Sequence, residues 1–400
     1  MNNETRKETQ VLPKDVRYVG ADDLTLPLFE NQYPVQPMGV SYNSYLILDE
    51  KVAVMDSVDA RTADEWLAKL AHELDGRSPD YLVISHMEPD HSGSILRLAE
   101  KYQEMKLVGN TKTFTMLRQF FGAKAPTDDR LLEVGEGETL PLGAHTLHFM
   151  LAPMVHWPEV MVAYEETEKL LFSADAFGRF GALSRTAAAP WAPQARRYYY
   201  NIVGKYGAQV QALLKKASAL EIKTVCPLHG PVLTGEALGE ALRLYDLWSR
   251  WQSESPDDIL LAHASIHGNT ARAAELLKQK LEAKGARVTL CDLTTTEVSY
   301  AVANAFYCGK LVLACSTYDG GLFPPMEEFL SHLQAKGFRS RTVGLMENGS
   351  WAPAAARLMR AKLEEMKDLR VCGTVVSLRS ALSPASEAQM DALTTELCAK

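Results

Sequence analysis

A dense run of metal-competent side chains limits what this chain can fold into more than any other feature of the sequence. His86, Glu88, Asp90 and His91 fall within six residues, directly after the apolar stretch 81–84. In an irregular loop, alternate residues can face the same way, so the first three side chains could converge on one cavity with His91 beside them. We therefore expect a metal-binding loop at the end of a β-strand.

Three further candidates, His156, Asp175 and His229, stand in turns of a similar kind, with small residues and prolines around them. Seven ligands are too many for one tetrahedral zinc, but they suit two metals that share a bridge. Three of the seven are carboxylates, which favour harder, higher-coordinate ions such as iron or manganese. By contrast His145, His148 and His263 have no such company, and we expect structural or surface roles for them.

The first part of the chain reads as mixed β-strands and helices. Apolar strand patterns cover residues 41–48 and 52–55, and residues 63–74 carry apolar side chains at helical spacing. Strand, loop and helix alternate up to about residue 250, with a hairpin-like region at 140–174. This mixture predicts an αββα sandwich, with sheets inside and helices outside.

A polar stretch that contains proline, residues 252–258, separates two differently patterned halves, so we expect a linker there and domains at 1–254 and 255–400. Beyond it, five apolar strands are predicted at 259–262, 287–290, 311–314, 342–346 and 371–376. They alternate with helical stretches at 271–284, 325–336, 354–367 and 386–398. Nearly continuous apolar strands of this kind are typical of a doubly wound parallel sheet, because both of its faces are covered.

Small polar residues follow three strands of this second half. The turn 264–270 comes after the first strand and opens a helix, so its hydroxyls and backbone N–H groups suit a phosphate dianion without a lysine. No G-K-[ST] step is present, which argues against an ATP-binding P-loop. Residues 316–321 and 347–352 follow the third and fourth strands. Ligands of such sheets bind at the carboxyl ends of the strands, where all three loops are expected.

The H-x-E-x-D-H run, with His156, Asp175 and His229 at increasing distance, resembles the metallo-β-lactamase-like domain of flavodiiron proteins. Hydrolases of that superfold usually carry a second histidine where Glu88 stands. The resemblance implies two irons and no catalytic residue beyond their ligands. It implies that His86, Glu88 and His156 hold one iron, that Asp90, His91 and His229 hold the other, and that Asp175 bridges them.

The three loops of the second half resemble the FMN site of flavodoxins, and residues 317–326 resemble the flavodiiron version more closely. This resemblance implies that the phosphate is surrounded by Ser265, His267, Gly268, Asn269 and Thr270, and the ring by Thr317, Tyr318, Asp319, Gly320, Ser350, Trp351 and Ala352, with Ser316 also at the cofactor. Trp351 or Tyr318 could stack on the isoalloxazine. Two departures are Asp319, where relatives often have asparagine, and Phe180, where many have histidine. The first favours a lower flavin potential, and the second bears on substrate preference.

A flavin in one half and a dimetal site in the other predict an oxidoreductase that reduces dioxygen to water, nitric oxide to nitrous oxide, or both. By resemblance, a head-to-tail homodimer, or a dimer of such dimers, brings the FMN of one subunit to the irons of the other. No C-x-x-C pair supplies an appended rubredoxin, so a separate rubredoxin or flavin reductase is the expected donor. Lys336, Arg339 and Arg341 could form its docking patch.

Composition excludes other classes of partner. The net charge is −8 and no long basic run occurs, which argues against nucleic acid. No recognisable signal segment and no run of about eighteen apolar residues is present, which argues against export and membrane insertion. Six cysteines without a C-x-x-C pair, three of them in apolar stretches, favour a reducing cytoplasm.

Two rival functions fit part of the pattern. A dizinc hydrolase fused to a flavodoxin-like module would contain zinc and act without a reductant. A non-enzymatic electron carrier or gas sensor would show flavin reduction without consumption of gas.

Overall fold

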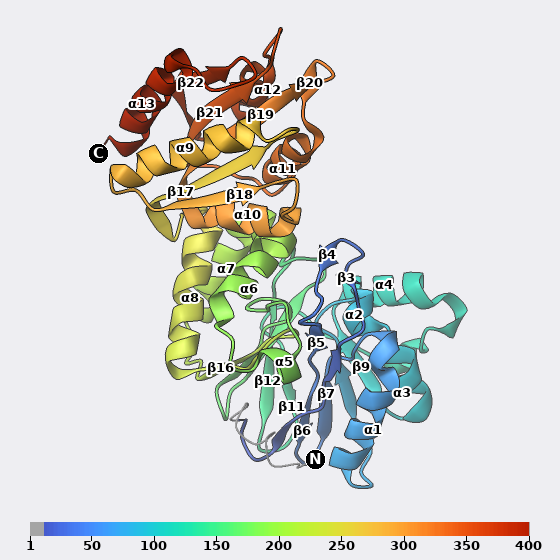
Figure 1. The fold of residues 1–400 in the computed structure, drawn as a ribbon. Helices are drawn as coiled ribbons and strands as arrows, with labels where there is room; N and C mark the ends of the chain where they lie inside the picture. Colours follow the sequence, from blue (N-terminus) through green and yellow to red (C-terminus); the bar gives the residue numbers. More distant parts are fainter. Residues whose placement is uncertain (1–11, 400) are drawn as a thin grey trace. The chain divides into compact units, whose positions relative to one another are not determined.

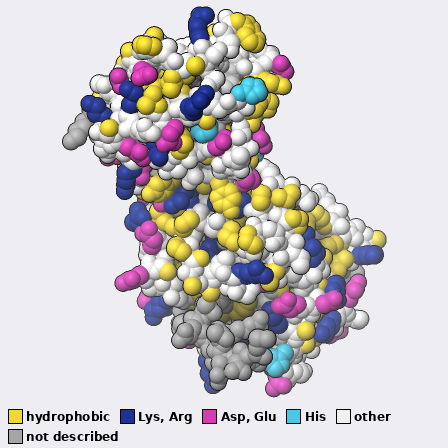
Figure 2. All heavy atoms as spheres, viewed as in Figure 1, with side chains coloured by type: hydrophobic (Ala, Val, Ile, Leu, Met, Phe, Trp, Pro, Cys, Tyr) yellow, Lys and Arg dark blue, Asp and Glu magenta, His cyan; other side chains and the backbone are white. Residues whose placement is uncertain are grey.

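A computed structural model of the chain describes residues 12–399. The chain divides into two compact units. The first comprises the described residues up to Tyr199 together with Ala208–Asp246, and the second comprises Tyr200–Gly207 together with residues from Leu247 onward. Figure 2 shows acidic and basic side chains interspersed over the displayed face of each unit. Within residues 12–399, no helix combines the length and apolar character needed to cross a bilayer.

The first unit is built on two six-stranded sheets. One has, in spatial order, β1 (Val16–Tyr18), β6 (Tyr45–Leu48), β7 (Val52–Met55), β8 (Tyr81–Val83), β9 (Lys106–Gly109) and β10 (Leu131–Glu133). The other has β11 (Thr139–Pro141), β12 (Thr146–Leu151), β13 (Met161–Glu165), β14 (Leu170–Phe172), β15 (Thr224–Cys226) and β16 (Leu233–Thr234). Two short pairs accompany them: β2 (Ala21–Asp23) with β5 (Val40–Tyr42), and β3 (Leu28–Phe29) with β4 (Tyr33–Pro34).

Helices cover the outside of this sandwich. They are α1 (Ala63–Leu74), α2 (Pro89–Ser92), α3 (Ile95–Lys101), α4 (Thr111–Phe121), α5 (Leu183–Thr186), α6 (Trp191–Tyr198), α7 (Gly207–Ala217) and α8 (Gly235–Ser249). Figure 1 shows α1, α3 and α4 on one side and α7 and α8 on the other, with the strands between. The expected αββα sandwich is therefore confirmed.

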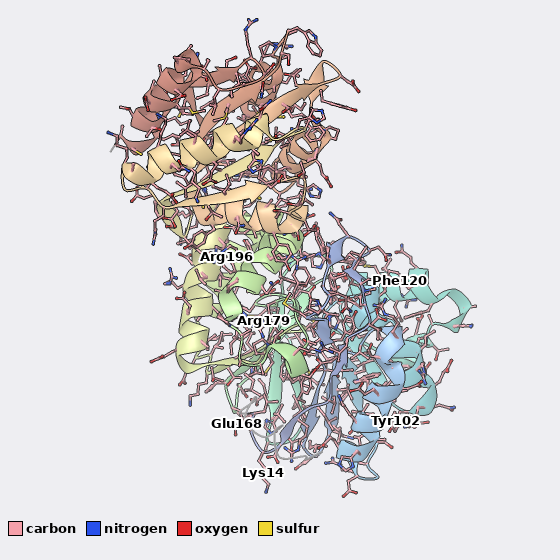
Figure 3. All side chains as sticks on the ribbon, in the orientation of Figure 1. Lys14, Tyr102, Phe120, Glu168, Arg179 and Arg196 are labelled. Carbon is pink, nitrogen blue, oxygen red and sulfur yellow. The ribbon has the colours of Figure 1, made fainter. Side chains whose placement is uncertain are left out.

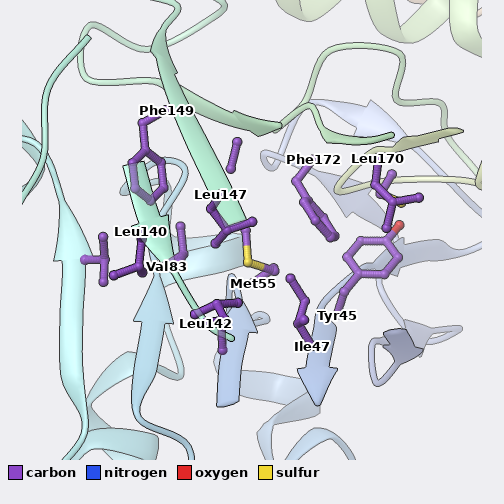
Figure 4. Close-up of a cluster of buried hydrophobic side chains, with 14 of the residues drawn as sticks. Tyr45, Ile47, Met55, Val83, Leu140, Leu142, Leu147, Phe149, Leu170 and Phe172 are labelled. Atoms are coloured by element: carbon purple, nitrogen blue, oxygen red, sulfur yellow. The ribbon is translucent and has the colours of Figure 1, made fainter. Parts of the chain in front are cut away.

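The core of the first unit lies between the two sheets. Tyr45, Ile47 and Met55 from one sheet meet Leu147 and Phe172 from the other, as Figure 4 shows, and all five are buried. Burying one such side chain contributes about 1.5–3 kcal/mol. This packing holds the loops at the strand ends in place.

Helix α1 has the predicted bounds, because its apolar spacing buries Trp66, Leu70 and Leu74 on one face. The strand expected over 41–48 is instead divided between β5 and β6, which belong to different sheets. The break is at Asn43, whose backbone N–H donates to the carbonyl of Leu228 (2.8 Å) instead of continuing a ladder.

The second unit has a parallel sheet in the order β18 (Val288–Asp292), β17 (Ser255–Ala264), β19 (Cys308–Tyr318), β21 (Thr342–Asn348) and β22 (Arg370–Leu378), with the short β20 (Gly321–Leu322) antiparallel to β19. This is the 2-1-3-4-5 order of flavodoxin-like folds, as expected. The helices are α9 (Asn269–Ala283), α10 (Val298–Tyr307), α11 (Pro324–Ala335), α12 (Ala355–Glu364) and α13 (Pro384–Cys398). Helix α10 was not predicted, because its apolar residues are not confined to one helical face.

Two expectations are corrected in this unit. Residues 255–258 are not linker but the start of β17, because Ser255 pairs with Cys308 and the backbone ladder forms whatever the polarity of the side chains. The docking patch suggested at Lys336, Arg339 and Arg341 is wrong in its third member, because Arg341 is buried. Its guanidinium donates to the carbonyls of Cys308, Trp251 and Phe306, each at 2.7 Å.

Candidate metal centre and flavin-binding edge

Four predicted ligands from three separate turns of the first unit meet in one group. Nε2 of His156 lies 2.9 Å from Oε2 of Glu88 and 3.1 Å from Oδ2 of Asp175. Nε2 of His86 lies 3.1 Å from the same oxygen of Asp175. One potential ligand atom from each of the four side chains lies within 4.8 Å of the other three, so this group could hold a metal ion.

The other three predicted ligands form a second group beside it. Nε2 of His229 lies 3.2 Å from Oδ2 of Asp90 and 3.1 Å from Nε2 of His91. Oδ1 of Asp175 lies 3.6 Å from Nε2 of His229. The two oxygens of Asp175 thus face one group each, which is the arrangement that a bridging carboxylate requires.

The sequence suggested an irregular loop over His86–His91, but part of this segment is helical. Asp90 and His91 belong to the short helix α2, which Pro89 opens. The helical turn separates these two side chains from those of His86 and Glu88. One contiguous run of sequence therefore supplies both groups.

Several buried ligand atoms have no hydrogen-bond partner among the described residues. These are both ring nitrogens of His86, both carboxylate oxygens of Asp90, Nε2 of His156 and Oδ1 of Asp175. Burying polar atoms without partners is costly, and native proteins rarely do so in such numbers at one place. Cations at the two groups would satisfy most of these atoms at once.

Protonation of the site follows from its crowding. Burial alone would lower the pKa of His156, but the carboxylates of Asp175 and Glu88, within 3.1 Å of its Nε2, outweigh it and raise this pKa to about 10. Burial would raise the pKa of Glu88, but the rings of His156 and His86 beside it lower this pKa to about 2. For His91, burial dominates and lowers the pKa to about 4. Protons on histidines other than His91, such as His156, therefore balance the carboxylates in the metal-free protein, and metal ions would displace them.

The histidine turn at 227–230 is tied to β5 and to the link between β5 and β6. The side-chain amide of Asn43 donates to the carbonyls of Pro227 and Gly230, both at 2.8 Å. Nδ1 of His229 lies 2.7 Å from the carbonyl oxygen of Ser41, an interaction in which the ring N–H donates. This bond leaves Nε2 as the ring atom that faces the cluster. Histidine ligands in metal sites commonly donate their other ring N–H in this way.

The Asp175 turn is braced by an internal arginine. Arg179, labelled in Figure 3, is buried and donates to the carbonyls of Ala189 (3.0 Å) and Thr186. Its Cγ would lie 2.6 Å from a Cβ at Gly230, whose φ is +80°. Only glycine fits at that position beside His229.

In the second unit the loops after β17, β19 and β21 meet at the carboxyl edge of the sheet. The hydroxyl oxygens of Thr270 and Ser316 lie 2.8 Å apart, and the amide of Asn348 donates to the Thr270 hydroxyl at 3.2 Å. Helix α9 begins after Gly268, at φ +88°, without a side-chain cap. The first N–H groups of this helix are therefore suited to an anion such as a phosphate.

The remaining predicted flavin contacts differ in exposure. Trp351 is 88% exposed and Tyr318 is 44% exposed with its ring 5.6 Å from that of Phe323. The exposed set also includes His267, Asp319, Gly320, Ser350 and Ala352, and the partly buried set Ser265, Asn269 and Thr317. The Thr317 hydroxyl accepts from the N–H of Ala354 (3.0 Å), so it also supports the start of α12.

Comparisons with known proteins agree with both units. Residues 40–230 match the family model described as ODP family beta lactamase. The chain is 28% identical to the rubredoxin-oxygen oxidoreductase of Megalodesulfovibrio gigas, over 87% of each chain, and 27% identical to the nitric oxide reductase of Moorella thermoacetica, over 88% of each. The crystal structure of the flavodiiron protein from Giardia intestinalis superposes with a TM-score of 0.87 and 25% identity, over 98% of each chain.

The chain belongs to the flavodiiron proteins. Each of these matches covers both units, so the similarity includes the sandwich and the flavodoxin-like sheet alike. Within this flavodiiron protein, the seven side chains singled out from the sequence are those that the fold brings together in two groups.

The departure at Phe180 has a structural consequence in this flavodiiron protein. Its ring is buried against Phe29 (5.6 Å between centroids) and Tyr198 (5.2 Å). Both of these rings in turn lie within 5.4 Å of His229. Phe180 thus supports the two rings that pack on His229 and lies under the Arg197 guanidinium (4.7 Å to the ring centroid), where histidine would add a polar group.

Sequence reasoning missed a fourth loop at the flavin-binding edge, after β22. The backbone N–H of Ser380 donates to Oδ1 of Asn348 (3.0 Å), and the Asn348 amide donates back to the Ser380 carbonyl (3.0 Å). The hydroxyls of Ser380 and Ser350 lie 2.8 Å apart. The signal was available, because β22 ends at the same edge as the other parallel strands.

Proposed function

We propose that this flavodiiron protein reduces dioxygen to water, nitric oxide to nitrous oxide, or both, at a di-iron site supplied with electrons by FMN. The observation that carries the proposal is the pair of ligand groups joined by Asp175, with buried ligand atoms that cations at the two groups would satisfy. The relatives named as oxygen oxidoreductase and nitric oxide reductase support the choice of substrates.

His86, Glu88 and His156 would hold one iron and Asp90, His91 and His229 the other, with Asp175 between them. When bound, FMN supplies single electrons and the two irons supply the place where a diatomic gas is reduced. The protein holds the ligands in place through Asn43 and Arg179 and keeps bulk water away by burial. Carboxylates make up three of the seven ligands, which favours iron over zinc.

Residues 1–254 would form the metal-binding domain and residues 255–400 the FMN-binding domain. The phosphate would bind at the start of α9, among Ser265, His267, Gly268, Asn269 and Thr270, and the ring beside Tyr318 and Trp351. The exposed ring of Trp351 suits an aromatic ligand, because a flat ring stacked on it would remove apolar surface from water.

We also propose a head-to-tail homodimer or a dimer of such dimers. Four exposed apolar side chains stand at the ends of strands of the parallel sheet or on the loops that follow them: Ile266, Tyr318, Trp351 and Leu382. In the first unit, exposed Phe120 stacks on Trp157, the neighbour of His156. A second copy would cover these surfaces, and sedimentation at several concentrations tests for it. Monomers with full activity would contradict it.

A rubredoxin or a flavin reductase would supply the electrons, and the cytoplasm is the proposed location. Five of the six cysteines are buried and none of the six is paired in a disulfide, which supports a reducing compartment.

Metal analysis combined with anaerobic turnover tests the function. With FMN reduced beforehand, each gas is added in turn, and we expect two irons per chain and oxidation of the flavin with consumption of at least one gas. Zinc in the purified protein together with hydrolysis of an ester or lactam would favour the hydrolase instead. Iron and FMN without consumption of either gas would favour a carrier or sensor.

A further inference from the structure

Glu159 links the two turns that carry the ligands of one group. It follows His156 by three residues and is 1% exposed. Its Oε1 accepts a hydrogen bond of 2.8 Å from the backbone N–H of Met87, the residue between His86 and Glu88. One carboxylate therefore joins the turn of His156 to the turn that carries the other two ligands of the same group.

Two further hydrogen bonds hold the segments that this link joins. The N–H of Met161 donates to the carbonyl of Ser85 (2.9 Å), and the side-chain amide of Asn110 donates to the backbone carbonyl of Glu159 (2.6 Å). The first bond fixes the two segments at their strand ends, and the second fixes Glu159 to the start of α4. Of these three bonds, the carboxylate bond to Met87 is the one that reaches the residue between His86 and Glu88.

The other oxygen of Glu159 is not used in this way. Oε2 is buried and has no hydrogen-bond partner among the described residues. Glu159 also lines a cavity of about 470 Å³, together with Asn110, Lys112, Leu151 and Pro158. A cavity of this size, whose mostly apolar lining also includes Lys112 and Glu138, has room for water or a small carboxylate.

We propose that Glu159 is a positioning residue that sets the geometry of the His86, Glu88 and His156 group through the backbone of Met87. This inference rests on the proposed metal site. It concerns one of the two ions, because Glu159 makes no described hydrogen bond to α2, which carries Asp90 and His91, or to the turn of His229. A separate bond, from the Ser92 hydroxyl to the Met87 carbonyl (2.8 Å), holds α2 to this turn and does not involve the carboxylate. Groups that orient ligands in this way typically change metal affinity ten- to hundredfold when removed.

Anaerobic titration of the metal-free protein with ferrous ion, and with cobalt(II) as a spectroscopic probe, tests the proposal. We expect the wild type to bind two ions. Glu159→Ala and Glu159→Leu should lower the affinity for one ion about ten- to hundredfold. The affinity for the other ion should stay within about threefold of the wild-type value. Glu159→Gln keeps an oxygen that can accept from Met87, so it should bind both ions nearly as the wild type does.

The cavity allows a rescue experiment that a merely structural defect would not pass. Added acetate should restore the weakened ion in Glu159→Ala, because the shortened side chain leaves room for it, and should not do so in Glu159→Leu, where leucine fills that room. The matched control is Glu138→Ala, which removes another carboxylate from the same cavity. Glu138 accepts a hydrogen bond from the N–H of Gly135, away from the ligands, so this substitution should leave the affinity for both ions unchanged.

An equal loss of affinity for both ions, or wild-type affinity for both ions in Glu159→Ala, would overturn the inference while leaving the proposed function intact. A wild type that binds neither iron nor cobalt would overturn both. Should the alanine variant not fold, the leucine and glutamine variants still make the first comparison, because both fill the space of the original side chain.

Discussion

The Nε2 atoms of His91 and His229 face each other at 3.1 Å in the interior of the first unit. Such a pair either shares one proton or binds a cation jointly. Oδ2 of Asp90 lies 3.4 Å from the first nitrogen and 3.2 Å from the second, so the three atoms surround one position. This geometry argues that His91 is a ligand and not merely a neighbour of the site.

His91→Ala is therefore expected to weaken one of the two ions at least about tenfold, since a ligand is lost outright. The other ion should be retained. Metal content after dialysis and anaerobic titration would measure this. His148→Ala provides the control, because His148 is partly exposed and pairs with Glu166 away from the cluster. Two tightly bound ions in His91→Ala would show that His91 does not ligate.

Asp175 and Asp90 should differ in the number of ions they affect. Asp175 faces both groups, whereas Asp90 faces only His91 and His229. Asp175→Ala should therefore release both ions, and Asp90→Ala only one. Iron per chain, measured on both variants purified under the same conditions, decides between this result and a site in which Asp175 serves a single ion.

Trp351→Ala should weaken FMN without changing the stability of the fold. Aromatic contacts of the expected kind contribute about 0.5–1.5 kcal/mol, so the dissociation constant should rise about two- to tenfold. The melting temperature of the flavin-free protein should not move, because the side chain is 88% exposed. Fluorescence titration with FMN measures the affinity. An unchanged dissociation constant would place the ring elsewhere.

Arg341 should matter for folding and not for docking. Arg341→Leu leaves the carbonyls of Cys308, Trp251 and Phe306 without their donor, and we expect a loss of about 3 kcal/mol or more in the free energy of unfolding. Urea unfolding followed by circular dichroism would measure it. Arg357→Leu, at an exposed position of α12, is the control. A stable Arg341→Leu variant that accepts electrons slowly would instead revive the docking patch.

Thiol labelling should distinguish the cysteines by burial. Burial raises the pKa of Cys315 to about 12 and that of Cys372 to about 11. At pH 8 both are almost entirely thiols, and since the thiolate is the nucleophile they should react slowly. Cys398, which is only partly buried, should be labelled first by iodoacetamide in the native protein. Mass spectrometry of the digested protein identifies the order, and early labelling of Cys315 would contradict it.

Much of this protein could be predicted from local sequence. Helix α1 was predicted with its bounds because amphipathic spacing is a property of twelve neighbouring residues. The parallel sheet was predicted from its continuous apolar strands. The seven proposed ligands were found because metal chemistry restricts side-chain types and because four of them lie together in one run.

Tertiary structure decided what joins these parts. Asn43 interrupts a strand to hold the turn of His229, Ser380 pairs with Asn348 at the flavin-binding edge, and Glu159 reaches Met87 from a distant turn. Each is a hydrogen bond between segments far apart along the chain. Asparagine, serine and glutamate are common at the surface, so the local sequence around these residues does not predict that they have buried hydrogen-bond partners. Only the folded arrangement of strands determines which backbone groups they meet.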